Sequence, residues 1–183
     1  MSLKQKKDGI LLETGTNEAE FLQFYLGKQR FGVNVAKVRQ IVVFKDLELV
    51  SLPNSNKVFL GTVYVRGQQV GVINLGEFLK IKDREENDKE LLLICEFDRR
   101  TTGFIIDNVE AIYRCSWEEF QPVGSASTVD QKYLVGSLII GEEIVFILDL
   151  ESIMGELNPE INIATYASKV DFKDKSCSDV KVL

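Results

Sequence analysis

Two stretches of this chain carry the same pattern of glycine and apolar residues. Gly32-Val-Asn-Val-Ala-Lys-Val-Arg-Gln-Ile41 aligns with Gly103-Phe-Ile-Ile-Asp-Asn-Val-Glu-Ala-Ile112 at a constant offset of 71 residues, from 32 to 103. The glycine and four apolar positions coincide: Val33 with Phe104, Val35 with Ile106, Val38 with Val109 and Ile41 with Ile112. The match indicates an internal duplication, which predicts two similar structural units.

A second match follows in the same order. The hairpin at Gly67 and the motif Ile73-Asn-Leu75 correspond to the hairpin at Gly141 and Leu148-Asp-Leu150, at offsets of 74 (67 to 141) and 75 (73 to 148). Each half then contains a strand pair, a short turn with helical potential, and a second hairpin that runs into a helical turn. That is enough to close a small barrel of about five strands. The alternative is that alternating apolar residues match by chance.

The spacing of apolar residues predicts a mostly β fold. Short runs rich in Val, Ile, Phe and Leu, separated by glycine or polar turns, are typical of strands. We expect strands at Phe21–Leu26, Arg30–Val35, Gly61–Arg66, Gln69–Asn74, Glu90–Phe97, Thr102–Asp107, Tyr133–Ile140 and Glu143–Leu148. Asp149–Leu157 is the one convincing helix, because its apolar residues recur at i, i+3, i+4 and i+7 before Asn158-Pro159.

Composition excludes several kinds of function. The 183 residues include 22 basic and 28 acidic side chains, and the net charge of −6 disfavours binding to a phosphate backbone. No histidine is present, which removes imidazole-activated nucleophiles, histidine-ligated metals and histidine phosphorelay. The three cysteines form no CxxC pair, which suits reduced thiols in a cytoplasm, and Cys95 lies in an apolar run typical of a core.

The ends and the middle of the chain are polar. We expect a tail at residues 1–19, a duplicated domain at 20–157 and a linker at 158–183. The charged run Lys80–Glu90 joins the two halves and is expected to be a solvated loop. With no signal peptide and no run of about 18 apolar residues, we expect a cytoplasmic protein.

Few residues suggest chemistry. The glycines fit no phosphate loop, and the adjacent pairs Glu118-Glu119 and Glu142-Glu143 point to opposite faces of a strand, so no cofactor, metal or catalytic residue is expected. Arg66 ends an apolar strand beside a turn glycine and is either a barrel-rim contact residue or a solvated cation. Its counterpart in the repeat is taken as Ile140, so the turn itself does not require arginine.

Two apolar residues follow the first hairpin of each half: Val38 and Ile41 in the first half, and Val109 and Ile112 in the second. They are either core residues or the lining of an apolar groove between the barrels, and such a groove is typical of a protein interface. Trp117, the single tryptophan, is an anchor for either a core or an interface.

Five ordered motifs together resemble the CheW-like domain of bacterial chemotaxis over residues 20–157. They are FLQFYLGKQRFGVNVAKVRQI, LPN, FLGTVYVRGQQVGVINLGEFL, TTGFIIDNVEAI and LVGSLIIGEEIVFILDLESIM. The stretches ILLETGTNEAEF and RCSWEEF resemble more closely the CheV proteins, in which a receiver domain follows the CheW-like domain. The final Asp-Val-Lys-Val-Leu183 resembles the start of a receiver's first strand, so we expect 158–183 to be a linker toward a receiver absent from this chain.

The resemblance implies two intertwined SH3-like barrels in a non-catalytic adaptor. Such an adaptor couples the cytoplasmic tip of chemoreceptors to the regulatory domain of the kinase CheA, without nucleic acid, cofactor or membrane insertion. Family contact positions fall on Val38, Gln40, Gly61, Arg66, Gly67, Gly103, Val109 and Ile112. Gln40 replaces the usual Glu, and Tyr-Val-Arg-Gly replaces the usual Asn-Leu-Arg-Gly, so receptor preference is expected to differ.

Three alternatives remain open from the sequence. The first is a standalone CheW coupling protein instead of a CheV-type one. The second is a barrel that binds a ligand or nucleic acid, although such barrels use aromatic platforms in a basic groove and this acidic chain has no evident one. The third is an enzyme that uses its carboxylates.

Overall fold

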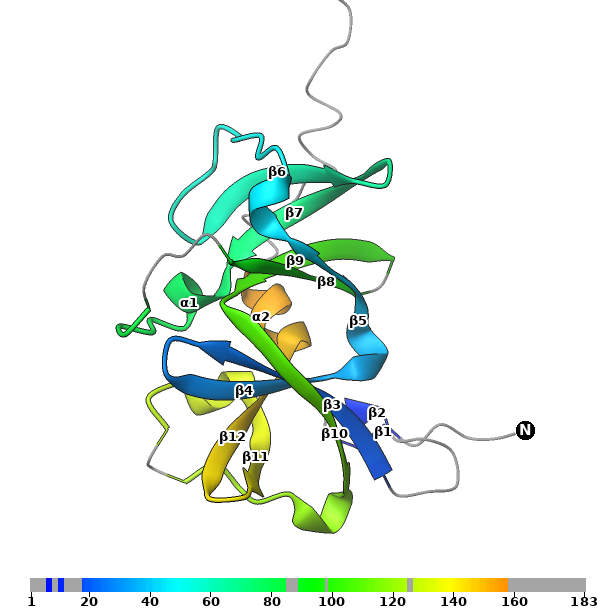
Figure 1. Cartoon of the computed structure of the whole chain (residues 1–183), viewed down its shortest axis with the longest axis vertical. Coiled ribbons are helices and arrows are strands. Elements are labelled where there is room, and N and C mark those ends of the chain that lie inside the picture. Colours follow the sequence, from blue (N-terminus) through cyan, green and yellow to red (C-terminus); the bar gives the residue numbers. More distant parts are fainter. Residues whose placement is uncertain are drawn as a thin grey trace, which may run out of the picture.

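The chain forms two five-stranded sheets, each curled into a small SH3-like barrel, as a computed structural model of residues 6–7, 10–11, 18–84, 89–97, 99–124 and 127–157 shows (Figure 1). We call the sheet with strand order β10-β3-β4-β12-β11 barrel 1, and the sheet with order β5-β8-β9-β7-β6 barrel 2. The strands of barrel 1 are β3 (Glu18–Leu26), β4 (Gln29–Asn34), β10 (Asn108–Ser116), β11 (Leu134–Ile140) and β12 (Glu143–Leu148). Those of barrel 2 are β5 (Val38–Val43), β6 (Phe59–Val65), β7 (Gln68–Asn74), β8 (Leu91–Phe97) and β9 (Arg100–Ile106).

All eight expected strands are confirmed, within two or three residues at their ends. Four short 3-10 turns (Val35–Lys37, Phe44–Asp46, Trp117–Glu119 and Gln131–Tyr133) and two helices, α1 (Leu75–Phe78) and α2 (Leu150–Leu157), complete the two barrels. The expected C-terminal helix is α2. It begins after Asp149, whose Oδ1 accepts hydrogen bonds from the backbone N–H of Glu151 and Ser152. Neither α1 nor α2 is long and apolar enough to cross a bilayer.

The duplication is confirmed by the strand orders. Along the two sheets β10 corresponds to β5, β3 to β8, β4 to β9, β12 to β7 and β11 to β6. Both parallel pairings recur, with β12 on β4 and β7 on β9. Isolated bridges close both barrels at equivalent places, Val50 to Thr62 and Gln121 to Ser137.

The idea that each half of the sequence closes its own barrel is wrong. The first repeat places its hairpin β3–β4 in barrel 1 and β5–β7 in barrel 2, whereas the second places β8–β9 in barrel 2 and β10–β12 in barrel 1. The chain crosses between barrels through the turn Val35–Lys37 and through Asp107. Strands β5 and β10 begin directly after these crossovers, where the sequence predicts turns.

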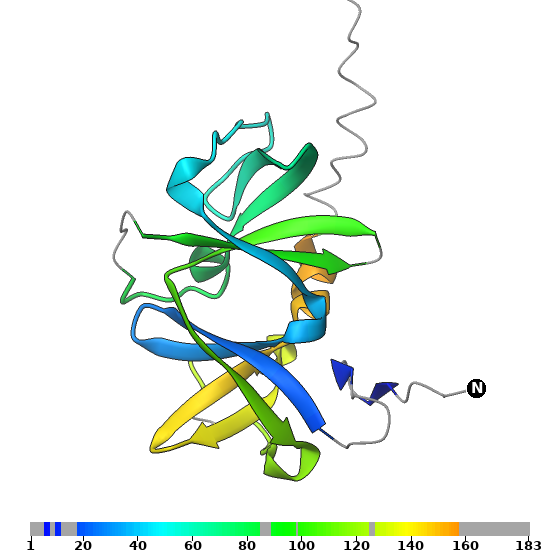
Figure 2. The same cartoon turned by 45° about the vertical axis from the view of Figure 1, so that its right-hand side comes forward.

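The largest apolar cluster lies between the two barrels. It joins Phe24 and Phe31 of barrel 1 to Phe59 and Phe104 of barrel 2, all with no exposed surface, and the buried face of α2 completes it. Figure 2 shows α2 at the junction of the two barrels. Two smaller clusters fill the barrel centres. The fold is therefore one domain with a shared core.

The boundary residues lie partly outside this description. Within the expected tail at 1–19, the structure describes the paired strands β1 (Lys6–Lys7) and β2 (Ile10–Leu11), and β3 already begins at Glu18. The expected linker at 158–183, with Cys177, lies outside the described residues.

Candidate protein-binding surfaces

Arg66 lies at the exposed tip of the β6–β7 hairpin. Val65 pairs with Gln68, so Arg66 and Gly67 alone form the turn, with backbone φ of 50° and 81°. Two positive φ values are typical of the turns that match the twist of a hairpin. The turn conformation therefore explains the glycine but not the arginine.

The correspondence of Arg66 with Ile140 is wrong by one residue. In barrel 1, Ile140 pairs with Glu143, so the turn residues are Gly141 and Glu142, and Arg66 corresponds to Gly141. Gly141 has a φ of 65°, a conformation that costs glycine nothing but strains arginine. At this turn position barrel 2 has an exposed arginine, whereas barrel 1 has glycine, which adopts the positive φ without strain.

Strands β5 and β10 carry four of the expected contact residues. Val38 and Val109 are half-buried at the margin of the shared core, as is Ile41, whereas Ile112 is 58% exposed. Both strands contain a register shift, between Val38 and Gln40 in β5 and between Val109 and Ile112 in β10. The two strands thus present equivalent apolar strips, of which Val38, Ile41 and Val109 pack against the shared core.

The three expected contact glycines have different surroundings. Gly61 has a φ of 136°, and a side chain there would collide with the carbonyl oxygen of Val50. Gly103 is buried, and a Cβ would lie 2.7 Å from the side chain of Leu92. Gly67 is exposed, and a Cβ there would meet nothing within 4 Å beyond its chain neighbours. Gly61 and Gly103 therefore support the barrel, and only Gly67 is directly accessible.

Further apolar side chains are exposed that the sequence reading did not single out. Ile139 and Ile144 pair across β11 and β12 and are 55% and 48% exposed, and Tyr64 on β6, at the position equivalent to Ile139, is 65% exposed. Strand alternation assigns these residues to the outer face. Their exposure is visible only once both faces of each strand are known.

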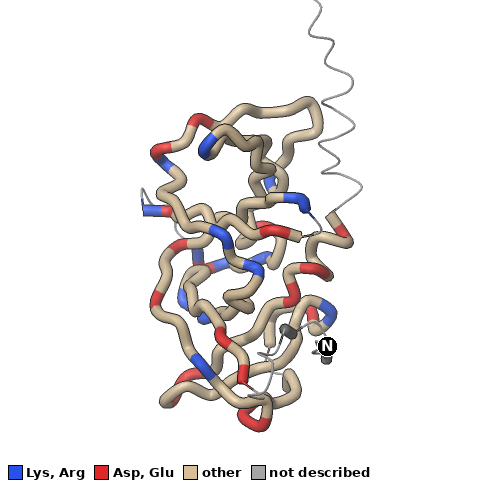
Figure 3. Tube along the Cα trace, turned by 90° about the vertical axis from the view of Figure 1, so that its right-hand side faces the viewer, with Lys and Arg blue, Asp and Glu red and all other residues tan. Residues whose placement is uncertain are grey.

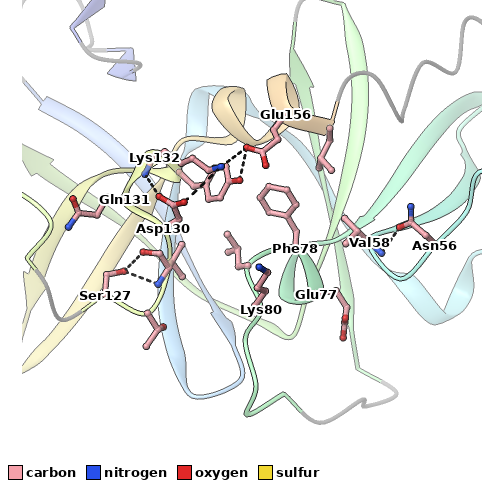
Figure 4. A pocket seen from close by; sticks show the side chains of 15 residues that line it. Asn56, Val58, Glu77, Phe78, Lys80, Ser127, Asp130, Gln131, Lys132 and Glu156 are labelled. Atoms are coloured by element: carbon pink, nitrogen blue, oxygen red, sulfur yellow. Dashed lines mark hydrogen bonds and ion pairs between the residues drawn. The ribbon is translucent and has the colours of Figure 1, made fainter.

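A cleft of about 900 Å³ opens between the barrels on the side of α1 (Figure 4). Phe78 of α1 packs against Tyr133 with a centroid distance of 4.9 Å and ring planes tilted by 60°, and the charged groups of Asp130, Lys132 and Glu156 line the same cleft. None of the expected contact residues lines this cleft.

The polar groups of Asp130, Lys132, Tyr133 and Glu156 contact one another in the cleft. Tyr133 donates a hydrogen bond of 2.6 Å to Glu156, and the Lys132 ammonium lies 2.9 Å from the same carboxylate. These two contacts lower the pKa of Glu156. A carboxyl held ionised in this way is poorly suited to act as a general acid. Among the residues that the structure describes, no cluster of His, Cys, Asp and Glu is arranged to hold a metal.

The remaining sequence candidates have structural roles. Cys95 and Cys115 are buried, and burial raises the pKa of the Cys95 thiol to about 12. Trp117 stacks on Phe120 at 4.9 Å beside the core of barrel 1. Both observations favour core packing.

Charge is divided unequally between the barrels. The strands and loops of barrel 1 (18–34 and 108–157) contain 11 acidic and 4 basic residues, whereas 38–107 contains 11 acidic and 10 basic. Figure 3 shows acidic residues gathered along barrel 1, in the lower part of the view. Barrel 1 is therefore the less suitable surface for an anionic partner.

Comparisons with known proteins agree with this architecture. The chain is 25% identical over 144 residues to the probable chemotaxis protein CheW of Rhizobium etli, covering 78% of this chain and 92% of that protein. It is 27% identical over 131 residues to the chemotaxis protein CheV3 of Helicobacter pylori, covering 69% of this chain but 42% of that protein. The chain spans about half, or less, of each matched CheV protein.

A solved structure has the same fold. The crystal structure of scaffolding protein TtCheW from Thermoanaerobacter tengcongensis superimposes with a TM-score of 0.65 at 21% identity, over 72% of this chain and 84% of that one. The sequence profile of the CheW-like domain matches residues 20–158. This match extends over both barrels and α2, so the chain belongs to the CheW-like domain family of chemotaxis proteins.

Proposed function

We propose that this protein is a non-catalytic adaptor that couples chemoreceptors to the kinase CheA, of the CheV type. Family membership supports a coupling role in chemotaxis. The observation that carries the proposal is Arg66, an exposed arginine in a strained turn conformation where the equivalent turn has glycine. Backbone strain that contributes nothing to the stability of the fold is common at binding sites.

The receptor-binding surface in this proposal runs along β5 and β10 and includes the hairpin tip. Val38, Val109 and Ile112 supply apolar area, and Arg66 supplies directional hydrogen bonds to the partner. Gln40 is half-buried opposite Ile94 and offers an amide where the family has a carboxylate. Because a neutral amide forms weaker hydrogen bonds to a cation, this position favours a receptor that does not depend on charge there.

The kinase-binding surfaces in this proposal are the exposed apolar side chains at the outer strands. Tyr64 serves on barrel 2, and the Ile139–Ile144 pair serves on barrel 1. Aromatic and aliphatic anchors surrounded by polar residues are typical of protein interfaces. The acidic surround of the barrel 1 pair favours a basic partner face.

The CheV assignment is tested separately from the adaptor role. It rests on the CheV-like stretches ILLETGTNEAEF (10–21) and RCSWEEF (114–120) and on the matches to CheV proteins. Mass spectrometry of the native protein, together with its coding sequence beyond Leu183, would distinguish the alternatives. A receiver domain supports the CheV type, and its absence supports a standalone CheW.

The adaptor role is tested by binding. We expect the chain to bind the cytoplasmic fragment of a receptor and the regulatory domain of CheA from its own organism, measured by biolayer interferometry. Arg66→Glu should weaken receptor binding about tenfold or more, because a desolvated interface charge is reversed. Arg99→Glu, at an exposed arginine directly before β9, is the matched control and should bind normally.

Both variants should keep the circular dichroism spectrum and melting temperature of the parent chain. Ile139→Asp should weaken binding to the regulatory domain of CheA and leave receptor binding unchanged, because Ile139 belongs to the proposed kinase-binding surface. Absence of binding to both partners would overturn the adaptor role, and normal receptor binding by Arg66→Glu would remove Arg66 from the site.

A further inference from the structure

Arg84 lies in the loop between α1 and β8, within the charged run expected to be solvated. Its side chain is only 10% exposed. A guanidinium removed from water must be matched by hydrogen-bond acceptors, since an unmatched buried charge is strongly destabilising. The partners of Arg84 therefore show whether the loop is held in one conformation.

Arg84 donates to three different side chains. Its Nε lies 2.5 Å from Oδ1 of Asp107, its Nη1 lies 2.6 Å from Oδ1 of Asn74, and its Nη2 lies 2.8 Å from Oε1 of Glu90. The side chains of Asp107 and Glu90 are themselves only 11% and 19% exposed. This cluster uses the full planar fork of the guanidinium, which lysine cannot reproduce.

Asp107 connects the cluster to the other barrel. It is the single residue between β9 of barrel 2 and β10 of barrel 1. Its Oδ2 accepts a hydrogen bond of 2.6 Å from the backbone N–H of Gly27, in the β3–β4 turn of barrel 1. Its own N–H donates to the carbonyl of Tyr25 in β3, at 3.1 Å. One carboxylate thus joins Arg84 of barrel 2 to the backbone of barrel 1.

Two glycines leave room for the loop. A Cβ at Gly76 would lie 2.6 Å from Cδ of Arg84, and a Cβ at Gly27 would lie 2.6 Å from the carbonyl oxygen of Asp83. Gly27 also has a φ of 59°. The Asp83–Arg84 segment therefore fits a slot with α1 on one side and a barrel 1 turn on the other.

We propose that Arg84 is a positioning residue that locks the two barrels in one relative orientation. Because Asp107 directly precedes β10, the lock also holds Val109 and Ile112 in place. Only this last link rests on the proposed receptor-binding function. The other crossover has a comparable contact, in which Lys37 pairs with Glu151 of α2.

The first test measures the coupling of two substitutions. Arg84→Gln removes the charge, and Gly76→Ala places a methyl group against the Arg84 side chain and pushes it out of its slot while every charged group is kept. Each should lower the melting temperature by about 5–12 °C, as expected for a disrupted buried ion pair. In the Arg84→Gln chain, Gly76→Ala should add little, because both changes disrupt the same contact.

Two variants serve as matched controls. Gly155→Ala, in α2, places its methyl group where nothing lies within 4 Å and should melt at or slightly above the parent temperature. Arg114→Gln removes an exposed arginine paired with Glu18 and Glu20 in barrel 1 and should change the melting temperature by about 2 °C or less. If Gly76→Ala and Arg84→Gln lower the melting temperature additively, Arg84 does not depend on the slot beside Gly76.

The second test measures orientation directly. Spin labels at Gln69→Cys in barrel 2 and Ile144→Cys in barrel 1 report the inter-barrel distance by pulsed electron paramagnetic resonance, in a Cys177→Ser chain whose buried Cys95 and Cys115 resist labelling. Arg84→Gln should broaden or shift the distance distribution, and Arg114→Gln should leave it unchanged. If Arg84→Gln does not fold, the milder Arg84→Lys replaces it.

The outcomes separate the lock from the proposed function. An unchanged distance distribution in the Arg84 variant would overturn the lock, whatever its melting temperature. A changed distribution in a protein that binds no receptor would uphold the lock and refute the adaptor role. A changed distribution with unaltered receptor affinity would overturn the link between orientation and binding.

Discussion

Replacing Arg66 by asparagine should make the protein more stable and less able to bind its receptor. Arg66 has a φ of 50°, in the left-handed region, and the equivalent turn residue is Gly141 with a φ of 65°. Asparagine adopts this region far more readily than arginine, because its short polar side chain forms local hydrogen bonds. Unlike glycine, it adds no large backbone entropy to the unfolded chain.

The size of the gain follows from the backbone cost. A non-glycine residue in this region costs on the order of 1 kcal/mol, and asparagine should recover about 0.5–1 kcal/mol of it. For a chain of this length that corresponds to a melting temperature higher by about 1–4 °C. Removing the guanidinium should at the same time weaken receptor binding about tenfold.

Arg99 supplies a matched control, because it is also an exposed arginine with a positive φ, of 66°. Arg99→Asn should gain the same stability and keep normal binding. Differential scanning calorimetry measures the first effect, and biolayer interferometry with a receptor fragment measures the second. If Arg66→Asn gains stability and binds normally, arginine at this turn has no binding role. If it loses stability, the strain argument is wrong.

Three further predictions concern the barrels. Gly61→Ala should lower the stability by about 2–3 kcal/mol, because of its φ of 136° and the nearby Val50 carbonyl, whereas Gly67→Ala should cost about 1 kcal/mol; urea denaturation compares them. Burial raises the pKa of the Cys95 thiol from 9.0 to about 12, so the thiol ionises at a lower pH in the unfolded chain than in the folded one. The free energy of unfolding should therefore fall as the pH rises from about 9 to about 12. Native Cys95 should also resist iodoacetamide at pH 8. Fluorescence anisotropy should detect no salt-sensitive binding of single-stranded oligonucleotides, and tight binding would favour the nucleic-acid alternative.

Two of the ten barrel strands, β5 and β10, were not recognisable from the sequence, because few of their side chains are buried and a bulge interrupts the little alternation that they have. A bulge shifts the register between Val38 and Gln40 in β5 and between Val109 and Ile112 in β10. An extra residue breaks the alternation of inward and outward side chains on which strand recognition depends. Strands β6 and β11 also contain register shifts, but each has a run of three buried residues and ends at a two-residue turn that the sequence marks with glycine.

Arg84 escaped notice for a different reason. Its neighbours in sequence are charged, and a charged run is usually solvated. The acceptors that bury it come from Asn74, Glu90 and Asp107, which lie at separate places along the chain. No local pattern contains this set, so the cluster became visible only when the loop was placed against α1 and the crossover.

The amino-acid sequence alone determined the duplication, the mostly β class and the turn that carries Arg66, because apolar periodicity and turn residues act over a few neighbouring positions. Only the tertiary structure decided which hairpin joins which barrel, which apolar residues remain exposed and where Arg84 is buried. Those outcomes depend on contacts between segments far apart in the chain, and their free energy is not encoded in any short stretch. The exchange of hairpins between the two repeats is the clearest case, since each hairpin has the same local pattern in either barrel.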